Sequence, residues 1–244
     1  MRAVLERELS GYFRTVSGYL FLAMYTLLAG IVMVFINIGR EMSASANLTL
    51  SAMTLPFLLI APLLTMRLFA EERRTRTDQL VMTSPIRTVS IVLGKFLSAA
   101  VMLLMGMVLV SFCFLFLSRW ARISAVETLC VFIGYYLHGL SLLSVGLLIS
   151  ALCSGQMIAG LLTLGVNLFL YLNEQYILPE ISGRAGSLSV TILRWLPSTD
   201  RLGDFANGVM SLSDIVYFLG FTGLMIFMTV LTVEGRRFAR RRGL

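Results

Sequence analysis

Charged residues are scarce in this chain of 244 residues, and their scarcity limits what the protein can be. Only 14% of the residues are charged and 57% are hydrophobic, whereas roughly a quarter of the residues of a typical soluble domain are charged. The mean hydropathy is +0.86. This composition excludes a soluble globular enzyme, a disordered chain and a nucleic-acid-binding domain. It indicates an integral membrane protein, and the length suits one helical bundle rather than several domains.

Cysteine and histidine are equally sparse. The cysteines, Cys113, Cys130 and Cys153, lie in or beside apolar runs without a CxxC pair, so they predict neither a disulfide framework nor a metal site. The single histidine, His138, lies midway along an apolar run. We expect it to form a hydrogen bond between helices. A catalytic base and a ligand are the alternatives, although no second catalytic group accompanies it.

Motifs for catalysis and nucleotide binding are missing as well. Gly94 and Lys95 are followed by Phe96, so the sequence lacks a phosphate-binding loop with its magnesium-binding hydroxyl. No GxSxG or HExxH motif is present. We therefore predict that the chain is not an enzyme and holds no cofactor. If ATP drives its activity, ATP and Mg²⁺ bind to another chain.

Six apolar runs are candidates for membrane-spanning helices, which need about 20 mostly apolar residues. They are predicted at residues 18–38, 48–66, 92–117, 129–152, 157–172 and 215–233. The fifth is short. Pro56 and Pro62 should bend the second. None of the 13 acidic residues falls within these runs, which disfavours a transporter driven by protons or sodium.

The distribution of Lys and Arg predicts the orientation. Most of these 20 residues lie in segments 1–17, 67–91 with Lys95, 153–156 and 234–244. The alternate segments contain Arg40, Arg119, Arg122, Arg184, Arg194 and Arg201. The first set is therefore predicted to be cytoplasmic, with both termini on the cytoplasmic side of the membrane. We expect Lys95 to snorkel to the interface and the basic tail after 234 to contact lipid headgroups rather than nucleic acid.

A densely charged link, residues 67–91, joins the second and third predicted spans. Its Glu and Arg residues recur at spacings of three and four, which supports a helix that extends past the membrane surface. Ser84 and Pro85 then read as the start of the next helix. We expect a short charged helix that projects into the cytoplasm. The alternative is a solvated loop that only satisfies the charge asymmetry.

The same link resembles a family signature. Residues 68–80, 83–86 and 91–95 read LFAEERRTRTDQL, TSPI and IVLGK. They resemble the pattern EERxxGTxExL, then SP, then LGK, of type-2 ABC transporter permeases (the ABC-2 membrane family). Arg76 stands where the family usually has Gly, and Gln79 where Glu is common. Residues 8–19 and 205–217 also resemble this family. Within it, the chain is most similar to permeases of gliding motility and of nitrous oxide reductase maturation.

The resemblance implies an all-α half-transporter with six spans. Two permease subunits, identical or homologous, would pair and dock on a cytoplasmic ABC ATPase dimer, which would move the second and third spans. The ATPase-coupling residues would be Glu71, Glu72, Arg73, Arg74, Thr75, Arg76, Thr77 and Asp78. The sequence does not identify the cargo, although spans with few polar groups favour a lipid-linked, amphiphilic or polymeric substrate. The competing interpretation is a membrane assembly or anchoring subunit that transports nothing.

Two further segments complete the predicted architecture. Residues 1–17 have the spacing of an amphipathic interfacial helix, in which Glu6, Arg7 and Glu8 are candidate ATPase contacts. Residues 173–214 form a long outer segment, and the resemblance implies short re-entrant helices there. Its candidate gate residues are Glu174, Trp195, Asp204 and Phe205. An extracytoplasmic accessory protein is a further candidate partner.

Overall fold

Helices account for all the regular structure in the parts of the chain that can be described. The computed structural model describes residues 2–38, 46–74, 87–117, 125–173, 202–206 and 210–242. The helices are α1 (Arg2–Arg14), α2 (Val16–Met33) with a π-helical turn at Val34–Ile38, α3 (Ala46–Thr65), α4 (Ala70–Arg74), α6 (Thr88–Leu117), α7 (Ala125–Leu152), α8 (Gln156–Leu172), α11 (Leu202–Ala206) and α12 (Leu212–Arg242).

Five of the helical segments are long and apolar enough to cross a membrane: Val16–Ile36, Leu48–Arg73, Thr88–Leu115, Val126–Leu152 and Leu212–Phe238. The chain is thus a multi-pass membrane protein. The predicted fifth span corresponds to α8, which has 17 residues and is shorter than the other five. The count of six spans therefore stays a prediction. The last helix is longer than predicted, since α12 begins at Leu212 and continues to Arg242.

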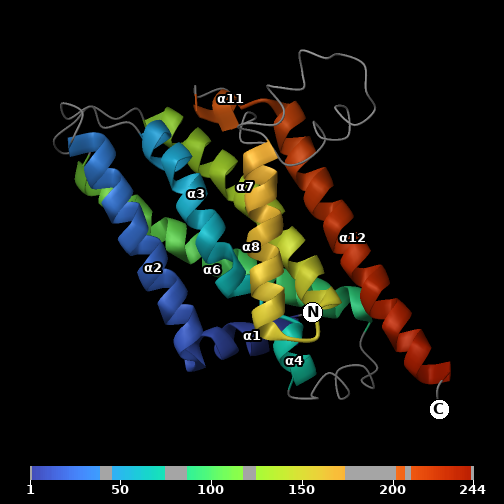
Figure 1. Cartoon of the computed structure of the whole chain (residues 1–244). Helices are drawn as coiled ribbons and strands as arrows, with labels where there is room; N and C mark the ends of the chain where they lie inside the picture. Colours follow the sequence, from blue (N-terminus) through green and yellow to red (C-terminus); the bar gives the residue numbers. More distant parts are fainter. Residues whose placement is uncertain are drawn as a thin grey trace.

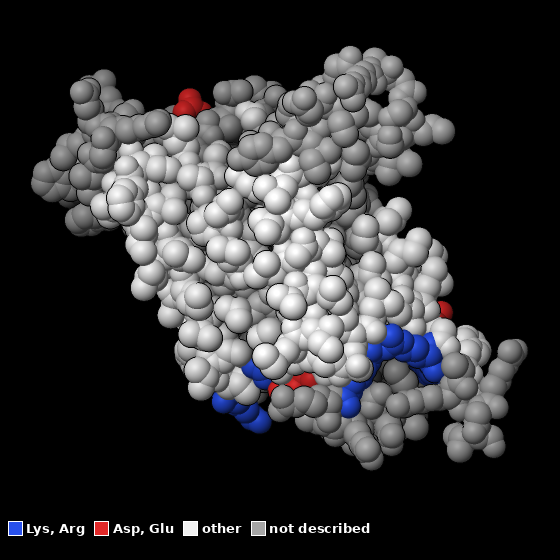
Figure 2. All heavy atoms as spheres, viewed as in Figure 1, with Lys and Arg blue, Asp and Glu red and all other residues white. Residues whose placement is uncertain are grey.

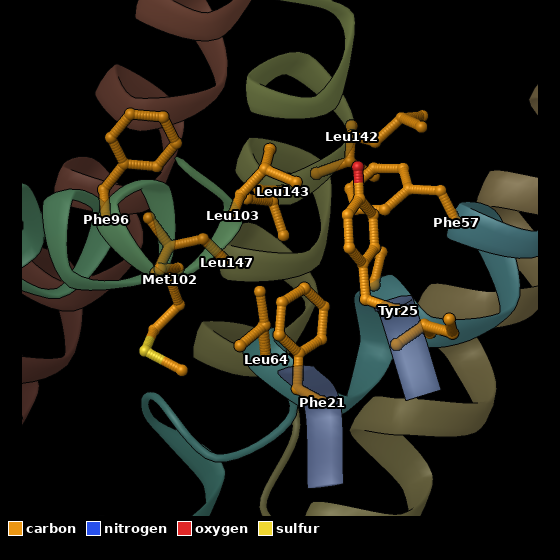
Figure 3. Close-up of a cluster of buried hydrophobic side chains, with 14 of the residues drawn as sticks. Phe21, Tyr25, Phe57, Leu64, Phe96, Met102, Leu103, Leu142, Leu143 and Leu147 are labelled. Carbon is orange, nitrogen blue, oxygen red and sulfur yellow. The ribbon is translucent and has the colours of Figure 1, made fainter. Parts of the chain in front are cut away.

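The helix α7 lies at the centre of the bundle and contacts α3, α6, α8, α11 and α12. A row of aromatic rings links it to α2 and α3. Tyr25 stacks on Phe21 at 5.7 Å and meets the edge of Phe57 at 6.2 Å, and Phe57 lies 5.9 Å from Tyr135. Figure 3 shows part of this core, in which side chains from distant parts of the sequence interdigitate. Burial of such large side chains is the main source of packing energy.

A sharp corner separates α1 from α2, so α1 lies across one end of the bundle (Figure 1). Thr15 has an extended backbone (φ −110°, ψ 154°), and its hydroxyl donates to the carbonyl of Gly11 at 2.7 Å. A Cβ atom at Gly18 would lie 2.5 Å from the carbonyl oxygen of Tyr12. Only glycine permits this close approach. The helix α1 is therefore folded back against the spans, and its predicted position at the membrane interface stays a prediction.

Candidate functional site

Lys and Arg side chains gather at one end of the molecule. On the face shown in Figure 2, the Lys and Arg side chains of the described residues lie at the lower end, and the middle of that face has no charged side chain among the residues described. The helices α1 and α4 and the C-terminal part of α12 lie at this end, while α11 lies at the opposite end (Figure 1). We call these the charged end and the far end.

Lys95 is the most deeply buried charge at the charged end. Its side chain is 1% exposed, and its ammonium has three acceptors. These are a carboxylate oxygen of Glu8 at 2.9 Å, a carboxylate oxygen of Glu72 at 2.9 Å, and the carbonyl oxygen of Leu68 at 2.5 Å. The ring of Phe69 lies 5.1 Å below it. An ammonium has three donors, so every one of them is satisfied.

Arg7 completes this arrangement from α1. Its guanidinium donates to Glu8 at 3.1 Å and to Glu72 at 2.5 Å, on the more exposed side. The four residues Arg7, Glu8, Glu72 and Lys95, here the Lys95 cluster, carry two charges of each sign. They join α1, α4 and α6. Because a buried charge without a partner is costly, the three helices must be placed together for the cluster to form.

The cluster changes the acidity of two of its members. Burial alone would raise the pKa of the Glu8 carboxyl, but Lys95 and Arg7 outweigh it, so this pKa lies below its ordinary value. Burial alone would lower the pKa of Arg7, but Glu8 and Glu72 raise it. Both groups are therefore held in their charged forms.

The close approach of α1 to α6 depends on the residue before Lys95. A Cβ atom at Gly94 would lie 2.9 Å from both Cβ and Cγ1 of Val4. The absence of a side chain there lets the backbone of α1 rest on α6, which brings Glu8 within reach of Lys95. The LGK motif thus has a local structural role: its glycine makes room for α1 and its lysine binds α1.

The short helix α4 is attached to the end of α7. The backbone N–H groups of Phe69 and Ala70 donate to the hydroxyl of Ser150 at 3.1 and 3.3 Å. The guanidinium of Arg73 donates to the carbonyl of Cys153 at 2.6 Å and also to that of Ala151. The last carbonyls of a helix have no partner within it, so Arg73 satisfies two carbonyls at and just beyond the end of α7 while holding α4 there.

Two other arginines add to these connections. Arg236 of α12 donates to the carbonyl of Leu152 at 2.9 Å. Arg67, in the turn between α3 and α4, pairs with Glu71 at 2.7 Å and donates to the hydroxyls of Thr15 at 2.7 Å and of Ser17. As a result, the segment around α4 touches α1, α2, α6 and α7 through polar contacts.

Tyr12 fixes α1 from its buried side. Its hydroxyl donates to the carbonyl of Leu64 in the last turn of α3, at 2.6 Å. Burial is the main reason that the pKa of Tyr12 is raised. The hydroxyl is thus a permanent donor that ties the middle of α1 to α3.

The predicted coupling residues fall partly within this site. Glu71, Glu72 and Arg73 make the contacts given above, and Arg74 is the last residue of α4. Thr75, Arg76, Thr77 and Asp78 lie outside the described residues, as does the side chain of Arg74. On α1, Arg7 and Glu8 belong to the Lys95 cluster, whereas Glu6 is exposed on the helix surface.

One expectation about this end of the molecule was wrong. Lys95 does not snorkel, because Glu8, Glu72 and Leu68 supply its acceptors inside the protein. The charged helix expected to project from the 67–91 link stays a prediction, because residues 75–86 lie outside the described residues; the start of the link forms a turn after Thr65 and then α4, which packs against the bundle. Sequence spacing could not reveal the acceptors in α1 and α7 that hold these groups.

At the far end, Phe205 of α11 is completely buried. Its ring lies over Gly134 of α7, where an added Cβ atom would be 2.6 Å from the ring's Cγ atom. Of the other candidate gate residues, Glu174 and Trp195 lie outside the described residues. Asp204 is part of α11, but its side chain is not described.

His138 contacts α12 through its ring. The ring meets that of Phe218 edge to face, with centroids 5.9 Å apart, and its Nδ1 atom has no hydrogen-bond partner among the described residues. The expected hydrogen bond between helices is therefore not made by Nδ1. In the described part of the chain, no group of three His, Cys, Asp or Glu residues is placed to hold a metal ion.

The sequence matches the ABC-2 type transporter family over residues 1–179. This region contains α1, the 67–91 link and Lys95, and so every member of the Lys95 cluster. No curated protein matches the sequence.

Proposed function

The chain belongs to the ABC-2 type transporter family, which makes it the membrane (permease) component of an ABC transporter, and we propose that residues 67–91 couple a separate cytoplasmic ATPase to this membrane domain. The work done would be export or mechanical work on the outer side of the membrane. Permeases of this family normally work with an ATPase partner. No phosphate-binding loop is present in this sequence, so ATP and Mg²⁺ would bind to that partner.

The Lys95 cluster is the observation that carries the proposal. A segment that receives force from an ATPase must be firmly connected to the spans that it moves. Glu72 of α4 is paired with Lys95 of α6 at 2.9 Å and with Arg7 of α1 at 2.5 Å. A force applied to the link beyond Arg74 would therefore reach α1 and α6 together with α3.

The contacts of Arg73 extend this connection to a further span. Arg73 holds the end of α7, and α7 contacts most of the other helices of the bundle. Movement of the link would thus reach α7 as well as the second and third spans. Displacement of α7 would in turn act on Phe205 at the far end, since that ring rests on Gly134.

The proposed orientation places the charged end in the cytoplasm. Positively charged segments are retained on the cytoplasmic side, and α1, α4 and the C-terminal part of α12 lie at this end (Figure 1). In this orientation the coupling residues face the compartment that contains ATP. The bacterial inner membrane is the corresponding location, and the far end with α11 would be the outer side.

The proposal also includes the subunit composition and the cargo. Two permease subunits, identical or homologous, would pair, and an accessory protein would bind on the outer side. The similarity to permeases of gliding motility and nitrous oxide reductase maturation is a prediction from the sequence, and the family match over residues 1–179 does not bear on it. A lipid-linked, amphiphilic or polymeric cargo remains the preferred substrate class.

The test is a pull-down of the detergent-solubilised chain from the membranes of its native host. The wild type is compared with the double variant Glu71→Arg/Arg74→Glu, which reverses two charges at the start of the link. The matched control is Glu127→Arg in the first turn of α7, at the other end of that helix from α4. Bound proteins are identified by mass spectrometry, and ATP hydrolysis is measured on the eluate.

We expect the wild type and Glu127→Arg to retain an ATPase with a phosphate-binding loop, and the double variant to lose it. If no form retains an ATPase, the coupling proposal fails and the assembly or anchoring function becomes the better explanation. If all three forms retain the ATPase equally, an ATPase partner is established but the link is not its docking site.

A further inference from the structure

A groove of about 710 Å³ runs between α6 and α7. One face of α6 from Leu104 to Leu115 and one face of α7 from Thr128 to Leu137 line it. Lys95 at the charged end belongs to the other half of α6, and Gly134 of α7 contacts Phe205 of α11 at the far end. The lining residues therefore form the halves of both helices nearer the far end. Ligand pockets in proteins range from roughly 300 to 1,000 Å³. The groove is thus large enough for a small ligand or part of a larger one.

The groove offers almost nothing to a polar ligand. No charged residue lines it. The hydroxyl of Ser111 donates to the carbonyl of Val108 at 2.7 Å, and that of Tyr136 donates to the carbonyl of Ala100 at 3.3 Å. Thr128, the third polar lining residue, also has an interaction partner. Because these groups are engaged within the protein, recognition in the groove rests on apolar contact.

The mouth of the groove faces the hydrocarbon of the membrane. Leu104, Val108, Leu129 and Ile133 line it and are exposed on the surface of the bundle. All four lie within the segments Thr88–Leu115 and Val126–Leu152, which are long and apolar enough to span a bilayer. Further in, the rings of Phe114 and Phe132 meet edge to face at 5.7 Å. The groove therefore leads from the bilayer to an aromatic pair in which Phe114 is buried and Phe132 is partly buried.

A helix of a second subunit is a poor occupant. Helices approach closely in membranes where small residues face each other. The glycines of α6 and α7 at this level already face side chains of the same chain: Gly106 faces Tyr25, Gly134 faces Phe205 and Gly139 faces Leu103. The groove presents mainly Leu, Val, Ile, Met and Phe side chains instead. A flexible hydrocarbon chain can follow such a surface, whereas a helix cannot enter it.

We infer that the α6–α7 groove binds one acyl chain of a bilayer phospholipid from the leaflet at the far end. The chain lies along the aliphatic rim and ends against Phe114 and Phe132. It fills a space that the packing of α6 on α7 leaves open, so it acts as a resident lipid. The inference does not depend on the proposed ATPase, because it rests on the groove alone.

The inference can be tested with a tryptophan reporter and lipids brominated in their acyl chains, which quench tryptophan on contact. Both natural tryptophans, Trp120 and Trp195, are first replaced by Phe. The reporter is Phe114→Trp, at a groove residue that is only 4% exposed. Phe112→Trp, at 62% exposure on the same helix, reports contact with bulk lipid. Phe57→Trp, at 0%, reports the closed core.

Each variant is reconstituted in phosphatidylcholine and phosphatidylglycerol vesicles with natural or brominated chains. We expect brominated lipid to quench Phe114→Trp almost as strongly as Phe112→Trp, and to leave Phe57→Trp unquenched. Filling the groove with Ser111→Phe should remove the quenching of Phe114→Trp. The control Met105→Phe introduces the same side chain at an exposed position outside the groove. It should leave the quenching of Phe114→Trp unchanged.

Two results would overturn the inference. One is an unquenched Phe114→Trp, because a closed groove or a second protein segment would then exclude lipid. The other is quenching that Ser111→Phe does not relieve, because the bromines would then reach the reporter from outside the groove. Folding of each variant is checked by size-exclusion chromatography in detergent. If Phe114→Trp does not fold, Phe132→Trp is the reporter and the same two outcomes apply.

Discussion

Lys95 and Glu8 are separated by 87 positions in the sequence, yet the ammonium of one lies 2.9 Å from the carboxylate of the other. The pair connects α1 to the third span, and Glu72 attaches the start of the 67–91 link to the same ammonium. Glu72 and Lys95, which both belong to the signature between residues 68 and 95, thus meet Glu8 of α1 in a three-way junction.

Removal of the buried cation should strongly destabilise the junction. Lys95→Met leaves the carboxylates of Glu8 and Glu72 close together with only Arg7 to neutralise them. Breaking a buried ion pair in this way costs about 3–5 kcal/mol. We expect a large fall in the midpoint of thermal unfolding, measured in detergent by the loss of the monodisperse peak in size-exclusion chromatography.

We expect Lys95→Met to be strongly destabilising because Lys95 is buried, so the exposed cation Arg7 provides a control. Arg7→Gln removes the other cation of the cluster, but the Arg7 side chain is 58% exposed and exposed ion pairs contribute at most about 1 kcal/mol. It should therefore lower the midpoint only slightly. Equal effects of Lys95→Met and Arg7→Gln would show that the burial of Lys95 does not govern the stability of the junction.

Acid should weaken the attachment of α1. The pKa of Glu8 lies below the ordinary value of 4.5 because Lys95 and Arg7 stabilise its charged form against the effect of burial. Its contribution to stability is therefore complete above pH 4.5. It is lost as the pH falls further towards the lowered pKa. Unfolding midpoints measured from neutral pH to below 4.5 should fall with acid, and Glu8→Gln should reduce that slope. An identical slope in Glu8→Gln would contradict the role assigned to this carboxylate.

The positions of the helices could be predicted from the sequence because long apolar runs can cross a bilayer only as helices. The 67–91 link could also be identified from the sequence as a candidate functional segment, since its dense Glu and Arg residues are unusual in an apolar chain. The burial of Lys95 could not be predicted, because its acceptors in α1 and α4 come together only through tertiary packing. The docking of α4 could not be predicted either, because its partners, Ser150 and two carbonyls near the end of α7, are about 80 positions away in the sequence.

Loss of Arg73 should release α4 from α7. In Arg73→Gln the carbonyls of Ala151 and Cys153 lose their guanidinium donor. In the wild type, the amides of Phe69 and Ala70 donate to Ser150. We therefore expect hydrogen exchange at these two amides to be faster in the variant. Arg73→Lys should restore this protection only partly, because one ammonium cannot reproduce the planar fork that reaches two carbonyls. The readout is hydrogen–deuterium exchange resolved to peptides that contain residues 66–74.

The matched control for Arg73 is on another helix. Arg236→Gln removes the bond from α12 to the carbonyl of Leu152, which also lies at the end of α7. It leaves the contacts of α4 in place, so exchange at Phe69 and Ala70 should stay as in the wild type. Faster exchange in Arg236→Gln would mean that the end of α7, rather than Arg73 itself, controls the docking of α4.

The contact of α1 with α6 should be sensitive to a single methyl group. Gly94→Ala places a Cβ atom 2.9 Å from the Cβ of Val4, and overpacking of this kind costs about 1–3 kcal/mol. Val4→Ala removes Cγ1, which is one of the two clashing atoms, so the double variant should recover part of the lost stability. Thermal unfolding of the two single variants and the double variant forms a complete cycle. An additive cycle, without recovery, would show that the two residues do not meet.

A corresponding test applies at the far end, where Phe205 closes over Gly134. Gly134→Ala would place a Cβ atom 2.6 Å from the Cγ of Phe205. The whole Phe205 side chain must then move, because the clashing atom lies at the base of the rigid ring and not at the end of a flexible side chain. We expect α11 to shift away from α7 and the chain to lose about 1–3 kcal/mol of stability, measured by thermal unfolding. Phe205→Leu combined with Gly134→Ala should lose less stability than the sum of the two single changes.

Gly165→Ala is the control, since nothing lies within 4 Å of a Cβ atom there and alanine favours a helix. If Gly134→Ala is as stable as Gly165→Ala, Phe205 does not rest on α7, and the proposed transmission from α7 to the far end loses its contact.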